Sequence, residues 1–253
     1  MILRRFKFNF RSHAQKIWER ARKSATRSFW VVGSVIVLLF MADVSWNQMM
    51  KRLAPVDLSE TFNTSVIVVD RNDKLLRAFT TENGRWQLPL SQKDVAPHYY
   101  DLLLNFEDKS FYEHNGIVPK AFLRAAWQWG RNGRIISGGS TLTMQVARLI
   151  AAHSLTEQDK NTKRRRSLWT KFAQIKLALR LEKQLSKQKI MELYLQLAPF
   201  GGNLEGVRAA SLAYFGKEPK SLSMAEAATL VAIPQSPENR RPDRFPNRAK
   251  KAR

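Results

Sequence analysis

The feature that most constrains the fold is an apolar run of 23 residues near the start of the chain. Residues 28–50 carry a single charged side chain, Asp43, and their centre reads WVVGSVIVLLFMA. As an α-helix the run rises about 35 Å, enough to cross a hydrocarbon core about 30 Å thick. Trp30 and Trp46 lie where interfacial aromatic residues are common. The sequence therefore predicts one transmembrane helix over residues 28–50.

The residues before this run are strongly basic. Residues 1–27 contain nine Lys or Arg and one Glu, a net charge of about +8. Because basic flanks favour the cytoplasmic side, we expect residues 1–27 in the cytoplasm and the chain after residue 50 outside it. A cleaved signal peptide is the alternative. The long charged leader and the lack of a small-x-small cleavage site favour an uncleaved anchor.

The charge of the whole chain restricts its partners. The formal net charge is +22, of which about +14 lies outside the leader. Such a charge indicates a solvated basic surface, or binding to nucleic acid, anionic lipid or a phosphate-bearing substrate. A domain outside the cytoplasm is exposed to anionic lipid and to phosphate-bearing substrates, so we expect no nucleic-acid partner. Without cysteine, disulfides, thiolate metal sites and a cysteine nucleophile are excluded.

After the anchor, the pattern predicts a mainly helical domain with one small β element. Residues 51–63 have the composition of a linker, and the β-branched run 64–70, the turn RNDK and residues 75–81 predict a β-hairpin. Helices are expected after Pro97 and over residues 119–130, 142–152, 167–184, 186–197, 204–216 and 222–234. The tail from Pro234 is rich in Pro and Arg and is expected to be irregular.

The segment EDKSFYEHNG, residues 107–116, follows an apolar helical pattern. Its first residue, Glu107, is a carboxylate beside apolar groups, and partial desolvation makes such a group a better proton acceptor. Glu107 is therefore a candidate general base. The alternative is a structural acid at the end of a helix, with a structural His114 after it.

Two further segments are suited to binding an anion. GGSTLTMQ, residues 138–145, predicts a glycine turn and a capped helix start, whose N–H groups can bind an anion; ordinary capping is the alternative. Arg148 follows, and then six Lys or Arg between residues 160 and 171. Such donors suit phosphate oxygens, although a solvated face commonly explains a basic run. No Gly-Lys-Ser/Thr follows the glycines, which excludes a P-loop.

In order and spacing, these segments resemble the family 51 peptidoglycan glycosyltransferases, the polymerase domains of class A penicillin-binding proteins and their monofunctional relatives. The resemblance covers residues 64–240 and rests on five blocks: EDKSFYEHNG, GGSTLTMQ, RSLWTKFAQ, IMELYLQLAPFGG, and GVRAASLAYFGK with LSMAEAATLVAIPQSP. The amino-acid sequence around the last two blocks is most similar to that of the 1C subtype of penicillin-binding protein. The resemblance implies a lysozyme-like glycosyltransferase domain over residues 64–240 and leaves a basic tail at 241–253.

The family joins lipid II, a lipid-linked disaccharide, into β-1,4 glycan strands and releases undecaprenyl pyrophosphate with inversion at the anomeric carbon. By this resemblance Glu107 is the general base. Further positions match the family's substrate-binding residues: Asp108, Phe111, His114, Ser140, Thr141, Gln145, Arg148, Arg166, Lys171 and Gln174. Among them, Arg148, Arg166 and Lys171 match positions assigned to the pyrophosphate.

The sequence departs from the family at Thr170, where an Arg is usual, and at Gln174, where most members have a second Glu. Met144 and Gln196 also replace family residues. No metal site is evident and no cofactor is required, while a divalent cation at the substrate pyrophosphate is compatible with the sequence. Residues 117–136 resemble the family's membrane-facing region.

The expected partners are lipid II, the growing glycan strand, the bacterial inner membrane and cell-wall synthesis proteins. The sequence ends where 1C-type proteins continue into a transpeptidase domain, so we expect a monofunctional enzyme or a truncated product. Two other functions stay open. One is a glycan-cleaving lytic transglycosylase, and the other is a truncated, non-catalytic domain that binds lipid II or division proteins.

Overall fold

The computed structural model describes residues 64–120, 140–153 and 168–253, and the separate positions Ser34, Val37, Met41, Val44, Gln48, Val56 and Leu58. The chain divides into two compact units, Met1–Leu53 and Ala54–Arg253, and every element named below belongs to the second. Within the described residues, no helix is both long and apolar enough to cross a bilayer. The predicted transmembrane run at 28–50 falls outside them, apart from five separate positions.

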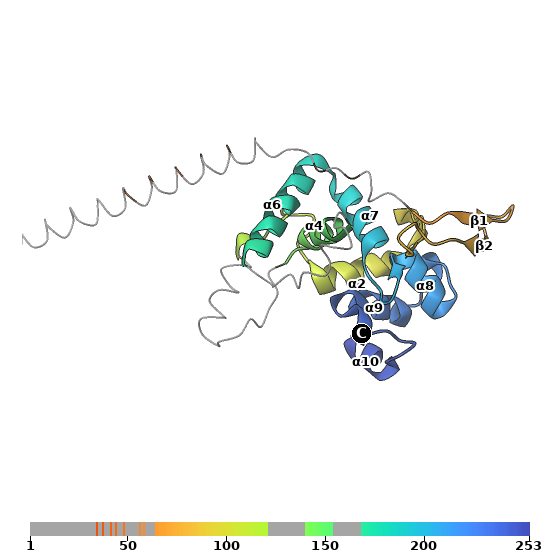
Figure 1. The fold of residues 1–253 in the computed structure, drawn as a ribbon. Helices are drawn as coiled ribbons and strands as arrows, with labels where there is room; N and C mark the ends of the chain where they lie inside the picture. The colour runs from red at the N-terminus through yellow and green to blue at the C-terminus, as the bar shows by residue number, and fades with distance from the viewer. Residues whose placement is uncertain are drawn as a thin grey trace, which may run out of the picture. The chain divides into compact units, whose positions relative to one another are not determined.

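The domain is mainly helical, as the sequence predicts (Figure 1). Its described α-helices are α2 (Pro97–Glu107), α4 (Leu142–His153), α6 (Leu168–Gln184), α7 (Lys187–Leu197), α8 (Val207–Phe215), α9 (Met224–Ala232) and α10 (Pro246–Ala252). Short 3-10 helices are η2 (Gln92–Asp94), η3 (Pro219–Ser221), η4 (Ile233–Gln235) and η5 (Pro237–Asn239). The predicted helix at 119–130 lies almost wholly outside the described residues.

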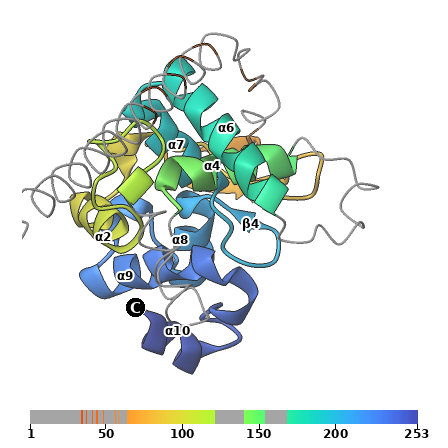
Figure 2. The same cartoon turned by 90° about the vertical axis from the view of Figure 1, so that its left-hand side faces the viewer.

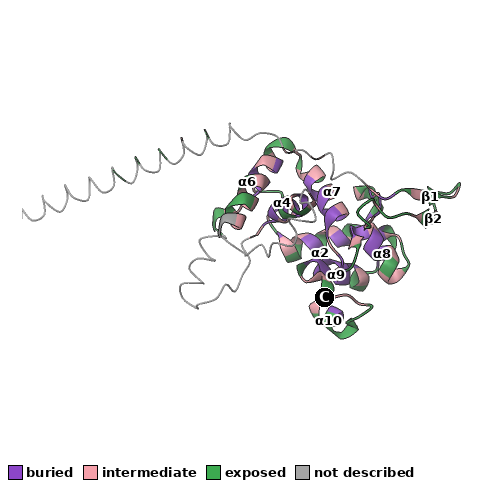
Figure 3. Ribbon diagram, viewed as in Figure 1, coloured by how far each residue is buried: buried purple, intermediate pink, exposed green. Residues whose placement is uncertain are grey.

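The core forms around α4. This helix packs against α6 and α7, while α2 packs along α9 (Figure 2). Apolar residues of α4 at helical spacing, including Leu142, Val146 and Ile150, are buried, as Figure 3 shows for the inner faces of the helices. Burial of such side chains contributes about 1.5–3 kcal/mol each before the entropy cost of folding. The packing therefore fixes the start of α4 beside the end of α2.

The predicted β-hairpin is confirmed. Strands β1 (Ile67–Val69) and β2 (Leu75–Ala78) pair antiparallel. The Asp70 carboxylate accepts hydrogen bonds from the backbone N–H groups of Asn72 and Lys74, which closes the turn. Asp73 adopts a φ of 58°, a left-handed conformation that Asp tolerates.

A second two-stranded sheet was not predicted. Strands β3 (Trp86–Gln87) and β4 (Leu204–Glu205) pair in parallel. The expected helix at 204–216 is therefore wrong in its first residues, because Leu204 and Glu205 are extended and α8 begins only at Val207. Gly206 separates strand from helix with a φ of 82° and a ψ of 153°, a conformation that excludes an earlier helix start.

The tail is also more regular than the sequence predicted. Beyond α9 the chain forms η4, η5 and α10, and α10 packs against α9. Pro246 stands in the first turn of α10, where its fixed φ suits a helix and its missing N–H costs nothing. Ala249 is buried on that helix. The expectation of an irregular tail is therefore wrong for residues 246–252.

Other helix ends follow their local signals. The Ser186 and Ser223 side chains accept the backbone N–H groups of Lys189 and Glu226, which confirms the predicted helix starts. Gly216 ends α8 in the left-handed conformation, as predicted.

Gly206 and Gly216 test how closely the backbone packs at the two ends of α8. A Cβ at Gly206 would lie 2.8 Å from the Gln196 carbonyl oxygen, whereas a Cβ at Gly216 would meet no atom within 4 Å. Gly206→Ala is therefore expected to lower the free energy of unfolding by at least about 2 kcal/mol. Gly216→Ala should cost only about 1 kcal/mol, the intrinsic left-handed penalty. Urea unfolding in detergent, followed by circular dichroism, measures both; equal losses would contradict the close contact at Gly206.

Candidate active site

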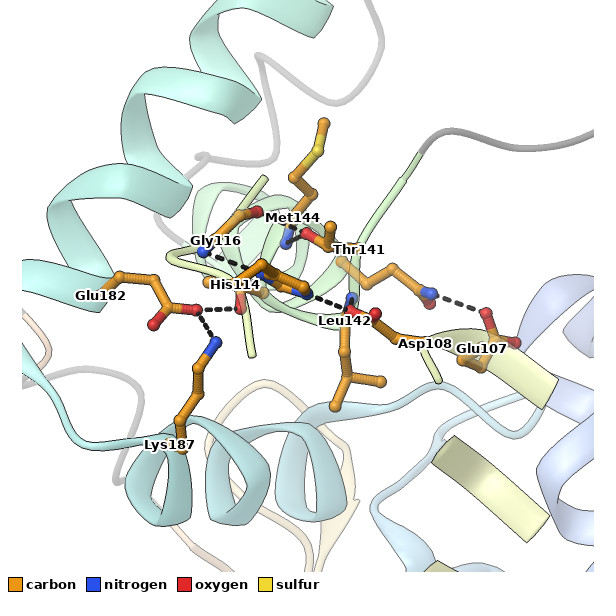
Figure 4. A network of polar contacts seen from close by, with 11 residues as sticks. Glu107, Asp108, His114, Gly116, Thr141, Leu142, Met144, Glu182 and Lys187 are labelled. Carbon is orange, nitrogen blue, oxygen red and sulfur yellow. Dashed lines mark hydrogen bonds and ion pairs between the residues drawn. The ribbon is translucent and has the colours of Figure 1, made fainter. Parts of the chain in front are cut away.

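Glu107 is the last residue of α2, and both of its carboxylate oxygens accept hydrogen bonds from side-chain amides. Gln145 Nε2 on α4 lies 2.7 Å from Oε2 (Figure 4). Gln235 Nε2 on η4 lies 3.1 Å from Oε1. Glu107 is partly buried, so the carboxylate keeps access to solvent while neutral N–H donors orient it. The two contacts fix the orientation of the carboxylate at the end of α2.

Asp108 connects the end of α2 to the start of α4. Its buried Oδ2 accepts a hydrogen bond from His114 Nε2 at 2.9 Å and another from the Leu142 backbone N–H at 2.9 Å (Figure 4). The Gly116 N–H donates to His114 Nδ1 at 3.0 Å. Because Nδ1 accepts, the ring proton lies on Nε2 and the imidazole is neutral. Asp108 and His114 therefore fix the loop after Glu107.

Thr141 confirms the capping interpretation of the GGST segment. Its hydroxyl oxygen accepts the Met144 backbone N–H at 3.2 Å, and its proton is donated to the Gly116 carbonyl at 2.6 Å. With the Leu142 N–H already bonded to Asp108, two of the free N–H groups at the start of α4 are occupied by protein acceptors. Any anion bound here depends on side-chain donors.

Such donors lie beside the same helix start. The Lys171 ammonium on α6 donates a hydrogen bond to the Ser140 hydroxyl. Burial and the neighbouring Arg148 guanidinium lower the pKa of Lys171, so the two cations lie close together. Within the described ranges, neither cation forms an ion pair with a carboxylate. Their positive charge is therefore available to an anionic group.

Two buried tyrosines, Tyr99 on α2 and Tyr194 on α7, respond to charges of the site. Burial chiefly raises the pKa of Tyr99 and Tyr194, neighbouring phenols raise it next, and the Glu107 carboxylate raises it further. The Arg148 guanidinium acts on the pKa of Tyr194 in the opposite direction. Glu107 and Arg148 therefore both influence one phenol, which links the α2 and α4 parts of the site.

Neither phenol has a hydrogen-bond partner among the described residues. A buried hydroxyl without a partner costs free energy, so Tyr194→Phe is expected to leave the free energy of unfolding unchanged or raise it by about 1 kcal/mol. Thermal melting of the two proteins measures the change. A clear loss of stability would indicate a hydrogen bond that the phenol makes elsewhere.

Phe111 is held by a separate polar cluster. Glu182 on α6 accepts hydrogen bonds from the Thr143 hydroxyl at 2.5 Å and the Lys187 ammonium at 2.7 Å (Figure 4). The same ammonium lies 4.5 Å from the centroid of the buried Phe111 ring. Phe111 thus serves the packing of the loop rather than lining an open surface.

The structure brings together most of the predicted site residues. Glu107 contacts Gln145, Asp108 contacts His114, and Lys171 contacts Ser140. Gln174 is partly buried on α6. Arg166 and most of the predicted membrane-facing segment 117–136 lie outside the described residues. In the part of the chain that is described, no cluster of three or more His, Asp or Glu is arranged to hold a metal ion.

The sequence reasoning missed Gln235, Arg240 and the two buried tyrosines. Arg240 Nη1 lies 3.2 Å from Gln235 Oε1 and 2.6 Å from the Ala232 carbonyl oxygen. The available signal was a polar residue directly after the last predicted helix, inside the fifth block. The sequence did not show that Gln235 contacts Glu107, because this contact depends on the packing of α9 along α2.

Comparisons with known proteins show which proteins this chain resembles. The family model described as "Transglycosylase" matches residues 72–253. Penicillin-binding protein 1C of Escherichia coli strain K12 is 45% identical over 228 residues, 90% of this chain and 28% of that protein. Penicillin-binding protein 1F of Bacillus subtilis strain 168 is 35% identical over 74% of this chain and 24% of that protein. The chain spans about a quarter of the length of these curated relatives.

Proposed function

The chain belongs to the transglycosylase family, and from this membership we propose that it is a peptidoglycan glycosyltransferase. Its substrate is lipid II, its product is a β-1,4 glycan strand, and the leaving group is undecaprenyl pyrophosphate. The observation that carries the proposal is the Glu107 carboxylate, oriented by two amides. One amide belongs to Gln145 on α4, the helix that also carries Arg148 one turn later, and Lys171 bonds Ser140 just before that helix. The mainly helical domain is consistent with a lysozyme-like fold.

In this proposal Glu107 is the general base. It takes the proton from the 4-hydroxyl of the acceptor sugar as the oxygen attacks the anomeric carbon of the growing strand. The bond between that carbon and the pyrophosphate oxygen breaks, and the leaving oxygen takes the electron pair. Attack opposite the leaving group inverts the anomeric configuration. The partly exposed carboxylate of Glu107, held by two amide donors, suits this role.

The cations stabilise the departing pyrophosphate. Negative charge grows on its bridging oxygen, so fixed positive donors there stabilise the transition state more than the bound substrate. Lys171 and Arg148 supply such donors, and we assign Arg166 to the same role by family resemblance. Ser140 orients Lys171 through its hydroxyl. No cofactor enters the scheme, and a divalent cation would arrive with the pyrophosphate.

The remaining site residues position these groups. Gln145 orients the base, and Thr141 caps the helix that carries Gln145 and Arg148. Asp108, Phe111 and His114 hold the loop behind Glu107. Gln174 lies one turn after Lys171 on α6, and we assign it a contact with the substrate.

The substrate is a membrane lipid, which fits the predicted anchor. We propose that residues 28–50 span the bacterial inner membrane, with residues 1–27 in the cytoplasm and the glycosyltransferase domain of residues 64–240 outside it. The basic surface would then face anionic lipid headgroups. Cysteine labelling at introduced sites before and after residues 28–50, in intact cells, tests this orientation.

The function is tested with the full chain in detergent and fluorescent lipid II. Long glycan strands that a muramidase digests are the expected product. Binding of lipid II without polymer, where a control polymerase works, would overturn the proposal in favour of a non-catalytic domain. Release of soluble sugars from isolated cell walls, dependent on Glu107, would instead indicate a glycan-cleaving enzyme.

A further inference from the structure

The Gln235 amide approaches Glu107 from the C-terminal part of the domain. Gln235 is the last residue of η4, the short helix that continues directly from α9. Because α9 packs along α2, this residue is brought to the end of α2 although it stands 128 positions later in the chain. Gln145 binds the other carboxylate oxygen, so the two contacts define the plane of the carboxylate.

Arg240 determines which way the Gln235 amide faces. Its guanidinium can only donate hydrogen bonds, and Nη1 lies 3.2 Å from Gln235 Oε1. The amide oxygen must therefore face Arg240, which leaves the amide N–H groups to face Glu107. Without Arg240, the amide could rotate and present its oxygen to the carboxylate, which would be repulsive.

Arg240 is itself held by the helix that precedes it. Nη1 also lies 2.6 Å from the carbonyl oxygen of Ala232, the last residue of α9. The neighbouring Glu238 accepts the Gly202 N–H at 2.8 Å and ties this segment to the loop before β4. The segment therefore forms a fixed support for the Gln235 side chain.

We propose that Gln235 and Arg240 are a positioning pair that orients the Glu107 carboxylate for proton transfer. The inference rests on the proposed function of Glu107 as the base. A fixed hydrogen-bond donor limits rotation of the carboxylate and holds it in the geometry that proton transfer needs. Gln235 thus acts through Glu107 and needs no contact with the substrate.

The first test replaces Gln235 with methionine, which keeps the length of the side chain but has no N–H donor. Gln235→Met is expected to lower kcat about 10-fold with KM unchanged, from the loss of one charge-assisted hydrogen bond. The loss should fall on kcat rather than on KM, because the amide orients the base and does not touch the substrate. Asn239→Ala, an exposed change on the adjacent η5, is the matched control and should behave as the parent.

The second test addresses the Arg240 part of the pair. Arg240→Ala should reproduce the loss of kcat with KM unchanged, and Arg240→Lys, which can still donate to the amide oxygen, should restore most of kcat. A folded Gln235→Met protein with the parent kcat would overturn the proposal. So would an Arg240→Ala protein that loses thermal stability but keeps the parent kcat, since that is the behaviour of a purely structural residue.

An infrared measurement separates this inference from the proposed function. The carboxylate band of Glu107 is obtained as the infrared difference between the parent protein and Glu107→Gln. If Gln235→Met shifts the frequency of this band, as the loss of one N–H donor requires, while no variant polymerises lipid II, the positioning pair stands and the proposed reaction fails. If the parent polymerises lipid II and Gln235→Met leaves the frequency unchanged, the reaction stands and the pair is rejected.

Discussion

Replacing Glu107 with glutamine is expected to lower the rate of lipid II polymerisation at least about 100-fold, the lower end of what a general base contributes. The substitution keeps the shape of the side chain but removes the group that would accept the acceptor hydroxyl's proton. Single-turnover polymerisation with labelled lipid II at saturating concentration measures the effect.

The structure adds a complication that a second measurement resolves. Both oxygens of Glu107 accept amide N–H groups, from Gln145 and from Gln235. In Glu107→Gln, an NH₂ group replaces one of these oxygens, so it faces the N–H donor of Gln145 or of Gln235. Lipid II affinity should therefore be measured in the same protein and is expected to change little compared with the rate. Glu113→Gln, an exposed neighbour, is the control and should stay within about twofold of the parent. Undiminished turnover in Glu107→Gln would reject Glu107 as the base.

Replacing Lys171 with alanine is expected to lower kcat about 100- to 1,000-fold, the usual cost of removing one fixed donor from a developing negative charge. The loss should appear in kcat more than in KM, because the charge on the leaving oxygen grows only in the transition state. Lys176→Ala, an exposed change on the same helix, is the control and should be nearly neutral. A loss confined to KM would indicate that Lys171 serves binding alone.

The same residue predicts how activity falls at high pH. Burial, and then the Arg148 guanidinium, lower the pKa of Lys171, so its ammonium loses its proton at a lower pH than an ordinary lysine does. If Lys171 must be charged for catalysis, kcat falls on the alkaline side at a lower pH than it would with an ordinary lysine. Removing the Arg148 charge with Arg148→Gln should move this fall to a higher pH, although the overall rate is lower. The comparison needs only the shape of the two pH profiles.

Much of the fold could be predicted because its signals are local. Pro97 starts α2, Ser186 and Ser223 cap α7 and α9, and Gly216 ends α8. Each of these residues acts on backbone groups within a few positions of itself, so the sequence alone carries the information. The ordered blocks likewise placed Glu107, Gln145 and Lys171 before any geometry was known.

The missed features are all long-range. The pairing of Trp86 with Leu204 depends on two segments meeting, and two-residue strands have no periodicity to detect. Gln235 contacts Glu107 only because α9 packs along α2. Arg240 lies in the segment after Pro234 that was expected to be irregular, and its hydrogen bonds to Ala232 and Gln235 require the folded backbone.

The origin of the two amides has a consequence for biosynthesis. One donor to Glu107 comes from position 145, and the other from position 235, separated from Glu107 by 128 residues. A nascent chain that has extruded the base and the first amide therefore still lacks the second. Its site is completed only after the last helices have emerged and docked on α2. A partly synthesised enzyme would then lack the second donor to its base until translation has passed that point.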